Sequence, residues 1–233
     1  MLDFIHSLFL WLFPQSCICC HSAIDSGVLC PTCFGRVTFL EKPYCYKCGK
    51  LFTNGVSHGT LCSQCNKNAH SFDQARALFL YNDFIKRLIV NIKKTGNRNI
   101  ICKCCELIVL RYNRFFHNIS AIVPVPSHWS RTIIRGFNPA DVIGWELSKL
   151  IDVPINRHLK RTRATSYQHK KTQAERLLNV RDAFEWNGEN IGNVLIVDDV
   201  LTTGATLDEC SRILRRSGAK KINCLTIAST KAY

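Results

Sequence analysis

The chain has 233 residues, and 46% of them are hydrophobic, so it can bury a sizeable core and is not disordered throughout. Its formal net charge of +14 excludes an acidic surface and favours polyanionic ligands, namely phosphorylated small molecules, nucleic acid or an anionic membrane surface. Fourteen cysteines are too many for an ordinary intracellular protein unless most of them bind metal or react.

The first residues, MLDFIHSLFLWLFP, are apolar, but no Lys or Arg precedes the apolar run as it would in a secretory signal. The run is also too short to span a bilayer, which takes about 20 residues. Phe4, Leu8, Trp11 and Leu12 recur at helical spacing and predict a short helix over residues 2–13, packed on the domain. An interfacial membrane helix is the alternative. Without export, metal binding explains the cysteines better than disulfides do.

Eight of the cysteines form four C-x-x-C pairs in a turn-rich segment with few residues for a core of its own. Two residues between cysteines let one tight turn aim both thiolates at one ion, and two such turns complete a tetrahedral zinc site. The spacing therefore predicts structural zinc, as one or two ions. The predicted ligands are Cys17, Cys20, Cys30, Cys33, Cys45, Cys48, Cys62 and Cys65. Sequential use of the pairs and an interleaved arrangement both stay open, and Cys19 falls out of phase as a spare thiol.

Beyond the cysteine region the pattern changes to ordinary strands and helices. A strand is predicted over residues 72–81, a helix with one apolar face over 83–94, and a second helix over 99–116. In the second helix Cys102 and Cys105 share a face and could bind metal. The leucines and isoleucines around them instead favour small core residues.

From residue 120 onwards strands and helices alternate, which predicts a mostly parallel sheet with right-handed crossovers. Asn138 is placed to cap a helix that has Pro139 at its first position. The strands are predicted at residues 121–126, 193–197 and 222–228, and the helices at residues 138–151 and 206–218.

The segment VLIVDDVLTTGAT, residues 194–206, leads from a buried strand into a helix and contains two adjacent carboxylates. Ligands bind at the carboxyl ends of parallel strands, where Asp198 and Asp199 are expected to lie. The loop behind them offers a glycine for a tight turn, threonine hydroxyls and the amides of a helix N-terminus, which together suit a phosphate monoester. Two carboxylates suit vicinal hydroxyls, so the segment predicts a ribose 5-phosphate site. The alternative is a capped helix with no ligand.

The same segment closely resembles the signature of type I phosphoribosyltransferases, which bind phosphoribosyl pyrophosphate (PRPP). A resemblance to the ComF family extends over nearly the whole chain, through the cysteine knuckles, VPVP at 123–126, R-x-x-x-R-G-F-N at 131–138 and Q…ER..NV..AF at 168–184. It implies an α/β fold with a type I phosphoribosyltransferase-like parallel sheet at residues 71–233, behind an N-terminal zinc-binding region at residues 1–70.

The resemblance also implies roles for individual residues. Asp198 and Asp199 would hold the ribose 2- and 3-hydroxyls. Arg131 would bind the departing pyrophosphate and Arg135 would neutralise it as a catalytic residue, although both arginines could equally be solvated surface charges. Magnesium would bridge pyrophosphate and ribose oxygens. The remaining implied ligand-binding residues are Val200, Thr202, Thr203, Gly204, Ala205 and Thr206 around the 5-phosphate, and Pro124 and Val125 near the pyrophosphate.

Residues 157–181 contain eight basic residues and one acid, Glu175. In similar proteins a mobile loop here covers the bound substrate and excludes water. Its side chains could equally grip a nucleic-acid backbone and stack on a base. The side chains in question are Lys160, Arg161, Arg163, Lys170 and Lys171, with the rings of Tyr167 and His169.

The resemblance implies a PRPP-binding accessory factor in DNA uptake during natural transformation, with catalysis left open. One alternative is an active phosphoribosyltransferase that transfers ribose 5-phosphate to an unidentified base or amine, and another is a regulator that binds PRPP without turnover. The implied partners are PRPP or a related ribose phosphate, single-stranded DNA, the competence machinery and a membrane surface, and a homodimer stays open. The expected location is the cytoplasm, with the inner face of the membrane as an alternative.

Overall fold

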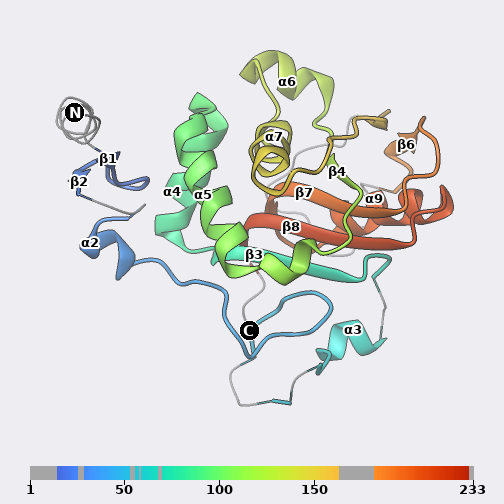
Figure 1. Cartoon of the computed structure of the whole chain (residues 1–233), viewed down its shortest axis with the longest axis horizontal. Helices are drawn as coiled ribbons and strands as arrows, with labels where there is room; N and C mark the ends of the chain where they lie inside the picture. The colour runs from blue at the N-terminus through green and yellow to red at the C-terminus, as the bar shows by residue number, and fades with distance from the viewer. Residues whose placement is uncertain are drawn as a thin grey trace, which may run out of the picture.

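A computed structural model gives the fold of the protein (Figure 1). The N-terminal helix expected at residues 2–13 lies outside the residues that it describes, as does most of the basic stretch 157–181. The described residues are 15–25, 29–52, 56–57, 59–67, 70–162 and 181–230.

The centre of the molecule is a four-stranded parallel sheet in the order β3-β8-β7-β4. The predicted parallel α/β sheet and its strands are thereby confirmed. Strand β7 is longer than expected, because its pairing with β8 continues as far as Leu201, opposite Ser229. The strands are β3 (Gln74–Leu80), β4 (Ala121–Pro124), β7 (Asn193–Leu201) and β8 (Lys221–Ser229).

Helices cover both faces of the sheet (Figure 1), as expected when central parallel strands consist of continuous apolar runs. One face packs against α4 (Asp83–Thr95), α5 (Arg98–Arg111) and α7 (Pro139–Ile151), through a core that includes Leu195 and Val197 of β7. The opposite face packs against α9 (Ala205–Arg216), through a second core with Val194 and Ile196. Alternate residues of β7 therefore belong to different cores.

The helix boundaries agree with the sequence in most places. Asn138 caps α7, and its side chain accepts a hydrogen bond from the amide of Ala140, as predicted. The second helix, α5, ends at Arg111 and not at residue 116. Tyr112 leaves the helical conformation, its hydroxyl donates to the carbonyls of Leu40 and Ala77, and the chain continues as the 3-10 helix η1 (Asn113–Phe116). A short helix, α6 (Trp129–Arg135), follows β4 and was not predicted from the sequence.

The cysteine-rich segment contains only short elements and lies along the edge of the sheet formed by β3. Phe39 forms an antiparallel bridge with Phe79, and the amide of Leu40 donates to the carbonyl of Leu78 at 3.0 Å. This pairing covers an edge that would otherwise expose unpaired backbone groups. The short elements of the cysteine-rich segment are β1 (Gln15–Ser16), β2 (Ala23–Ile24), α2 (Pro31–Phe34) and α3 (Ser63–Lys67). Elsewhere in the chain, β5 (Leu159–Arg161) pairs with β6 (Phe184–Trp186) in a separate antiparallel two-stranded sheet.

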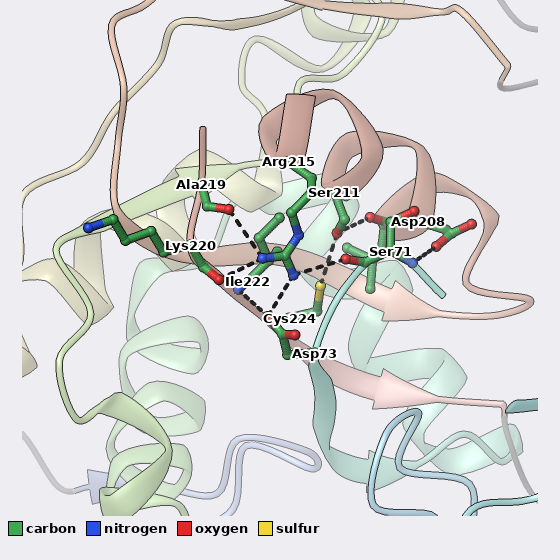
Figure 2. A network of polar contacts seen from close by, with 10 residues as sticks. Ser71, Asp73, Asp208, Ser211, Arg215, Ala219, Lys220, Ile222 and Cys224 are labelled. Atoms are coloured by element: carbon green, nitrogen blue, oxygen red, sulfur yellow. Dashed lines mark hydrogen bonds and ion pairs between the residues drawn. The ribbon is translucent and has the colours of Figure 1, made fainter. Parts of the chain in front are cut away.

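A polar network fixes the segment that leads from the cysteine region into β3 (Figure 2). The amide of Ser71 donates to the carboxylate of Asp208 in the first turn of α9. Asp73 Oδ2 accepts from the amide of Ile222 at 2.7 Å and from Arg215 Nη2 at 2.8 Å. The same arginine also donates to the carbonyls that follow α9, so the network joins three elements.

Replacing Asp73 by alanine should lower the free energy of unfolding by about 1–3 kcal/mol, because the amide of Ile222 then loses its acceptor. Asp73→Asn keeps an acceptor oxygen and removes only the charge, so it should retain much of the stability. Urea unfolding followed by circular dichroism measures both variants. An alanine variant as stable as the parent would show that the network does not hold the junction.

Candidate functional site

The eight paired cysteines form two separate groups. Within each group the four Sγ atoms all lie within 4.8 Å of one another. The Sγ–Sγ distances of 3.6 Å for Cys20–Cys30 and 3.7 Å for Cys48–Cys62 are close to the roughly 3.8 Å that separates two thiolates on one tetrahedral zinc ion. Both groups therefore fit zinc. The pairing is sequential, with Cys17, Cys20, Cys30 and Cys33 in the first group and Cys45, Cys48, Cys62 and Cys65 in the second.

The second group is part of the main structure. Its four cysteines are buried in the same core as Phe72 and Ala75 at the start of β3. Gly49, which follows the Cys45–Cys48 turn, has a φ of +70°, and a Cβ atom there would lie 2.7 Å from the carbonyl oxygen of Ala75. The turn thus needs glycine at this position for both its backbone conformation and its close contact with β3. By contrast, the first group includes the exposed Cys20.

Cys19 and the three cysteines of α5 belong to neither group. Burial raises the pKa of the Cys19 thiol to about 12, so Cys19 stays protonated at neutral pH. Cys104 and Cys105 are buried in the core between α5 and the sheet, whereas Cys102 is half-buried with its thiol 3.5 Å from Glu106 Oε1. Within the described residues no metal-binding group includes these cysteines. Cys105 is a small core residue, as predicted, whereas the prediction is wrong for Cys102, which is only half-buried and lies outside the core.

Asp198 and Asp199 lie within β7 and not just after it, because the strand continues to Leu201. Both are half-buried. Asp198 Oδ1 accepts a hydrogen bond from the amide of Asp199 at 2.8 Å. The pKa of Asp198 is raised to about 7, first by burial and then by the charge of Asp199. Two like charges at this position are therefore held together at a cost in free energy.

Two cations interact with the acidic pair, and the sequence did not predict either interaction. Lys93 Nζ, near the end of α4, is 2.9 Å from Asp199 Oδ2, and Lys93 keeps 31% of its side chain exposed. Arg161 of β5 lowers the pKa of Asp198 through its charge and so opposes the effect of burial. Arg161 was expected only as part of a basic loop, and nothing in the local sequence of α4 marks Lys93.

The turn from β7 into α9 contains Gly204 and the neighbouring threonines. Gly204 is the N-cap with a φ of 87°, a left-handed conformation that favours glycine, and it supplies no side-chain cap. The amide of Ala205 donates to Thr203 Oγ1 at 3.3 Å, and Thr202 is exposed. The first turn of the helix, including Thr206, therefore begins without a capping side chain at Gly204.

The turn after β4 lies beside the acidic pair because β4 and β7 are neighbours. Pro124 is paired with Val197, and the amide of Val125 donates to the carbonyl of Val197 at 2.9 Å. Asn138 holds this turn from the other side, since its Nδ2 donates to the carbonyl of Val125 at 3.0 Å. The helix cap of α7 thus also fixes the turn at which Pro124 and Val125 were predicted to lie.

The two arginines expected at the pyrophosphate are less well placed. The side chain of Arg131 lies outside the described part of the structure. Arg135 ends α6 and is half-buried, and no contact between described residues joins it to Asp198 or Asp199. The structure thus brings together the acidic pair, the loop 202–206 and the turn at 124–125, and leaves the arginines untested.

Comparisons with known proteins agree with both halves of this description. The family model of the double zinc ribbon domain matches residues 8–71, and that of the phosphoribosyl transferase domain matches residues 140–233. Competence protein F of Haemophilus influenzae is 31% identical over 228 residues, which cover 93% of this chain and 97% of that protein. The chain belongs to the competence protein F (ComF) family.

Other members of the ComF family are similar over the same length. DNA utilization protein YhgH of Escherichia coli is 28% identical, over 93% of this chain and 98% of that protein. Competence protein ComFC of Bacillus subtilis is 26% identical, over 91% of this chain and 93% of that protein. The match to a double zinc ribbon and the geometry of the two cysteine groups together identify two structural zinc sites.

Solved structures also resemble the chain. An adenine phosphoribosyltransferase is 17% identical, with a TM-score of 0.40, over 68% of this chain and 82% of that one. The orotate phosphoribosyltransferase of Aeropyrum pernix is 14% identical, with a TM-score of 0.38, over 66% of this chain and 68% of that one.

No helix among the described residues has the length and apolar character needed to cross a membrane.

The two zinc sites should differ in their effect on stability. We expect Cys20→Ser to release one zinc ion and leave the sheet folded, since Cys20 is exposed at the first site. Cys48→Ser should release the other ion and lower the melting temperature by on the order of 10 °C, because the second site is part of the core around Phe72. Zinc analysis and thermal unfolding measure both effects, and equal melting temperatures would contradict this difference.

The raised pKa of Asp198 predicts how stability depends on pH. The folded state retains a proton up to about pH 7 that the unfolded state releases near the ordinary Asp value of 3.8, so folding stability should fall as the pH rises between these values. Asp198→Asn cannot ionise and keeps an acceptor for the amide of Asp199. The variant should therefore be more stable than the parent at pH 8, by on the order of 1–3 kcal/mol, and lose this advantage near pH 4. Unfolding in urea across this pH range provides the test.

Proposed function

We propose that the loop between β7 and α9 binds PRPP or a related ribose phosphate, and that the protein acts as an accessory factor in DNA uptake. The observation that carries the proposal is the position of Asp198 and Asp199 directly before a glycine-capped helix N-terminus. This arrangement lies in the part of the chain that matches the phosphoribosyl transferase domain.

The 5-phosphate would lie at the start of α9. Gly204 allows the ligand to approach the backbone closely, and the amides of the first turn carry the positive end of the helix dipole. The exposed hydroxyl of Thr202 and those of Thr203 and Thr206 add donors around the same point. Val200 and Ala205 complete this loop through their backbone.

The acidic pair would accept hydrogen bonds from the ribose 2- and 3-hydroxyls. In the ligand-free protein Lys93 neutralises Asp199, and its partly exposed side chain can move aside when a hydroxyl takes its place. Carboxylate oxygens at this edge also suit magnesium held mainly by the substrate, which would supply charge neutralisation for the pyrophosphate. Pro124 and Val125 would approach the pyrophosphate from the neighbouring strand, with Arg131 and Arg135 as its proposed cationic partners.

Transfer of the ribose 5-phosphate to an acceptor base or amine is the second candidate function. The match to the phosphoribosyl transferase domain over residues 140–233 favours it. Release of pyrophosphate only when a base or amine is added would establish this activity, whereas binding without release would support a regulator.

The link with DNA comes from the relatives. One of them is named a competence protein in H. influenzae, and another a DNA utilization protein in E. coli. A double zinc ribbon region at residues 1–70 and a phosphoribosyltransferase-like domain at residues 71–233 form the proposed division of the chain. A cytoplasmic location near the membrane, contacts with the competence machinery and a homodimer remain part of the proposal.

Replacing Asp198 and Asp199 together by asparagine should weaken the binding of PRPP with magnesium at least about tenfold, because both acceptors for the diol lose their charge. Isothermal titration calorimetry measures the dissociation constant. Glu189→Gln, which neutralises an exposed carboxylate elsewhere, is the matched control and should bind like the parent. If the double variant binds PRPP as tightly as the parent, the site assignment is wrong.

A further inference from the structure

A cavity of about 560 Å³ lies between the segment that carries the second cysteine group and the sheet. The cysteine region contributes Tyr44 and Tyr46, which flank Cys45. The other wall consists of Arg76 of β3, Arg111 at the end of α5, and Arg114 in η1. The volume is within the range of sites that hold small organic ligands. No residue of the loop between β7 and α9 lines this cavity.

The inner wall is a buried cation surrounded by aromatic rings. Arg76 is only 6% exposed, and its guanidinium lies 4.5 Å from the centroid of the Tyr44 ring, 5.8 Å from that of Phe115 and 6.0 Å from that of Tyr46. Its Nη atoms donate to the backbone carbonyls of Ala75 and Tyr46, which fixes the plane of the guanidinium. Among the described residues no carboxylate forms an ion pair with Arg76.

The outer part of the cavity adds more positive charge. Arg111 uses Nη2 to bind Glu41 at 2.6 Å, but its Nε is buried and has no hydrogen-bond partner in the described part of the chain. Arg114 is exposed, and Lys42 lies at the same opening. No acidic side chain is found among the described residues that line the cavity. An anionic group in the cavity would therefore meet several cations.

The rings indicate what else the ligand contains. Tyr46 is 43% exposed, and its ring centroid lies 6.0 Å from the Arg76 guanidinium. Exposed tyrosines beside arginines suit the flat face of a nucleobase, and the arginines suit its phosphate. A duplex cannot offer a base in this way, because its bases are already stacked and paired.

We propose that this cavity binds one nucleotide of a single-stranded nucleic acid, with the base stacked on Tyr46 and the phosphate held by Arg111 and Arg114. The chemistry of the cavity points to a nucleotide. The choice of a strand over a free nucleotide rests on the proposed role in DNA uptake. The site lies at the junction between the second cysteine group and the sheet, and no described residue of the basic stretch at 157–181 lines it.

Fluorescence anisotropy with a labelled oligothymidylate of about 12 residues tests the site on the full-length, zinc-loaded protein. Tyr46→Leu and Arg114→Ala should each weaken binding about fivefold or more. Arg114→Ala should also reduce the slope of log K against log salt concentration by about 0.7, the value for one phosphate contact on a single strand. Zinc content and melting temperature of both variants should match the parent.

The control for charge is Lys220→Ala. Lys220 is exposed, and its side chain points away from the network in Figure 2, so this variant removes the same charge elsewhere and should bind like the parent. Lys160→Ala tests the competing location on β5. If Lys160→Ala loses binding while Tyr46→Leu and Arg114→Ala keep it, the strand lies along the basic stretch and the proposal is wrong.

Two further ligands test the details of the proposal. An abasic strand distinguishes base stacking from phosphate binding, and thymidine monophosphate distinguishes a strand from a free nucleotide. An abasic strand of equal length should bind the parent more weakly than oligothymidylate does, and this difference should disappear in Tyr46→Leu. An equal difference in both proteins would exclude stacking on Tyr46. If thymidine monophosphate competes as well as the strand does, a free nucleotide is the ligand and the assignment to a strand is wrong.

The same variants separate this proposal from the PRPP site. Tyr46→Leu should bind PRPP like the parent, and the Asp198→Asn, Asp199→Asn double variant should bind oligothymidylate like the parent. A parent protein that binds the strand but not PRPP would refute the ribose-phosphate assignment alone. A parent that binds PRPP but not the strand would refute the cavity assignment alone.

Discussion

The proposed ribose-phosphate site depends on keeping two adjacent carboxylates near the end of a buried parallel strand. Pairing with β8 continues along β7 past Asp198 and Asp199 to Leu201, so both aspartates belong to the strand and are half-buried. Two features reduce the cost: the pKa of Asp198 rises to about 7, and Lys93 pairs with Asp199. Both arrangements are reversible. A diol with its associated cation could replace them, which gives a physical reason for placing two like charges there.

The second zinc ribbon is integrated with this sheet and does not form a separate appendage. The second cysteine group shares a core with Phe72, and Gly49 allows its turn to contact β3 directly. Zinc therefore contributes to the fold where a small, turn-rich segment could not bury enough apolar surface alone. The same contact creates the cavity in which Tyr46 faces Arg76. A surface made from two regions of the chain in this way requires both to be folded.

The sequence predicted those features that depend on local spacing. The C-x-x-C pairs, the apolar runs of β7 and β8, and the cap at Asn138 are recognisable because turn geometry and strand periodicity act over a few residues. Three features depend on contacts between distant segments and could not be read in this way. The sequential pairing of the cysteines needed the path of the chain between knuckles. The approach of Lys93 to Asp199, and the stacking of Arg76 on Tyr44, needed the packing of α4 and of the ribbon on the sheet.

Helix α9 links the zinc-binding region to the proposed ribose-phosphate site through side-chain contacts at both of its ends. Its N-terminus forms the proposed phosphate cradle at Gly204. Asp208 in its first turn accepts the amide of Ser71, and Arg215 in its last turn binds Asp73, so both ends of the helix are attached to the segment that leaves the second zinc site (Figure 2). Because a helix is stiff along its axis, these attachments fix the direction in which its first amides point. The zinc ribbon thereby helps to orient the loop that would hold the ribose phosphate, although none of the eight zinc-binding cysteines lies near that loop in the sequence.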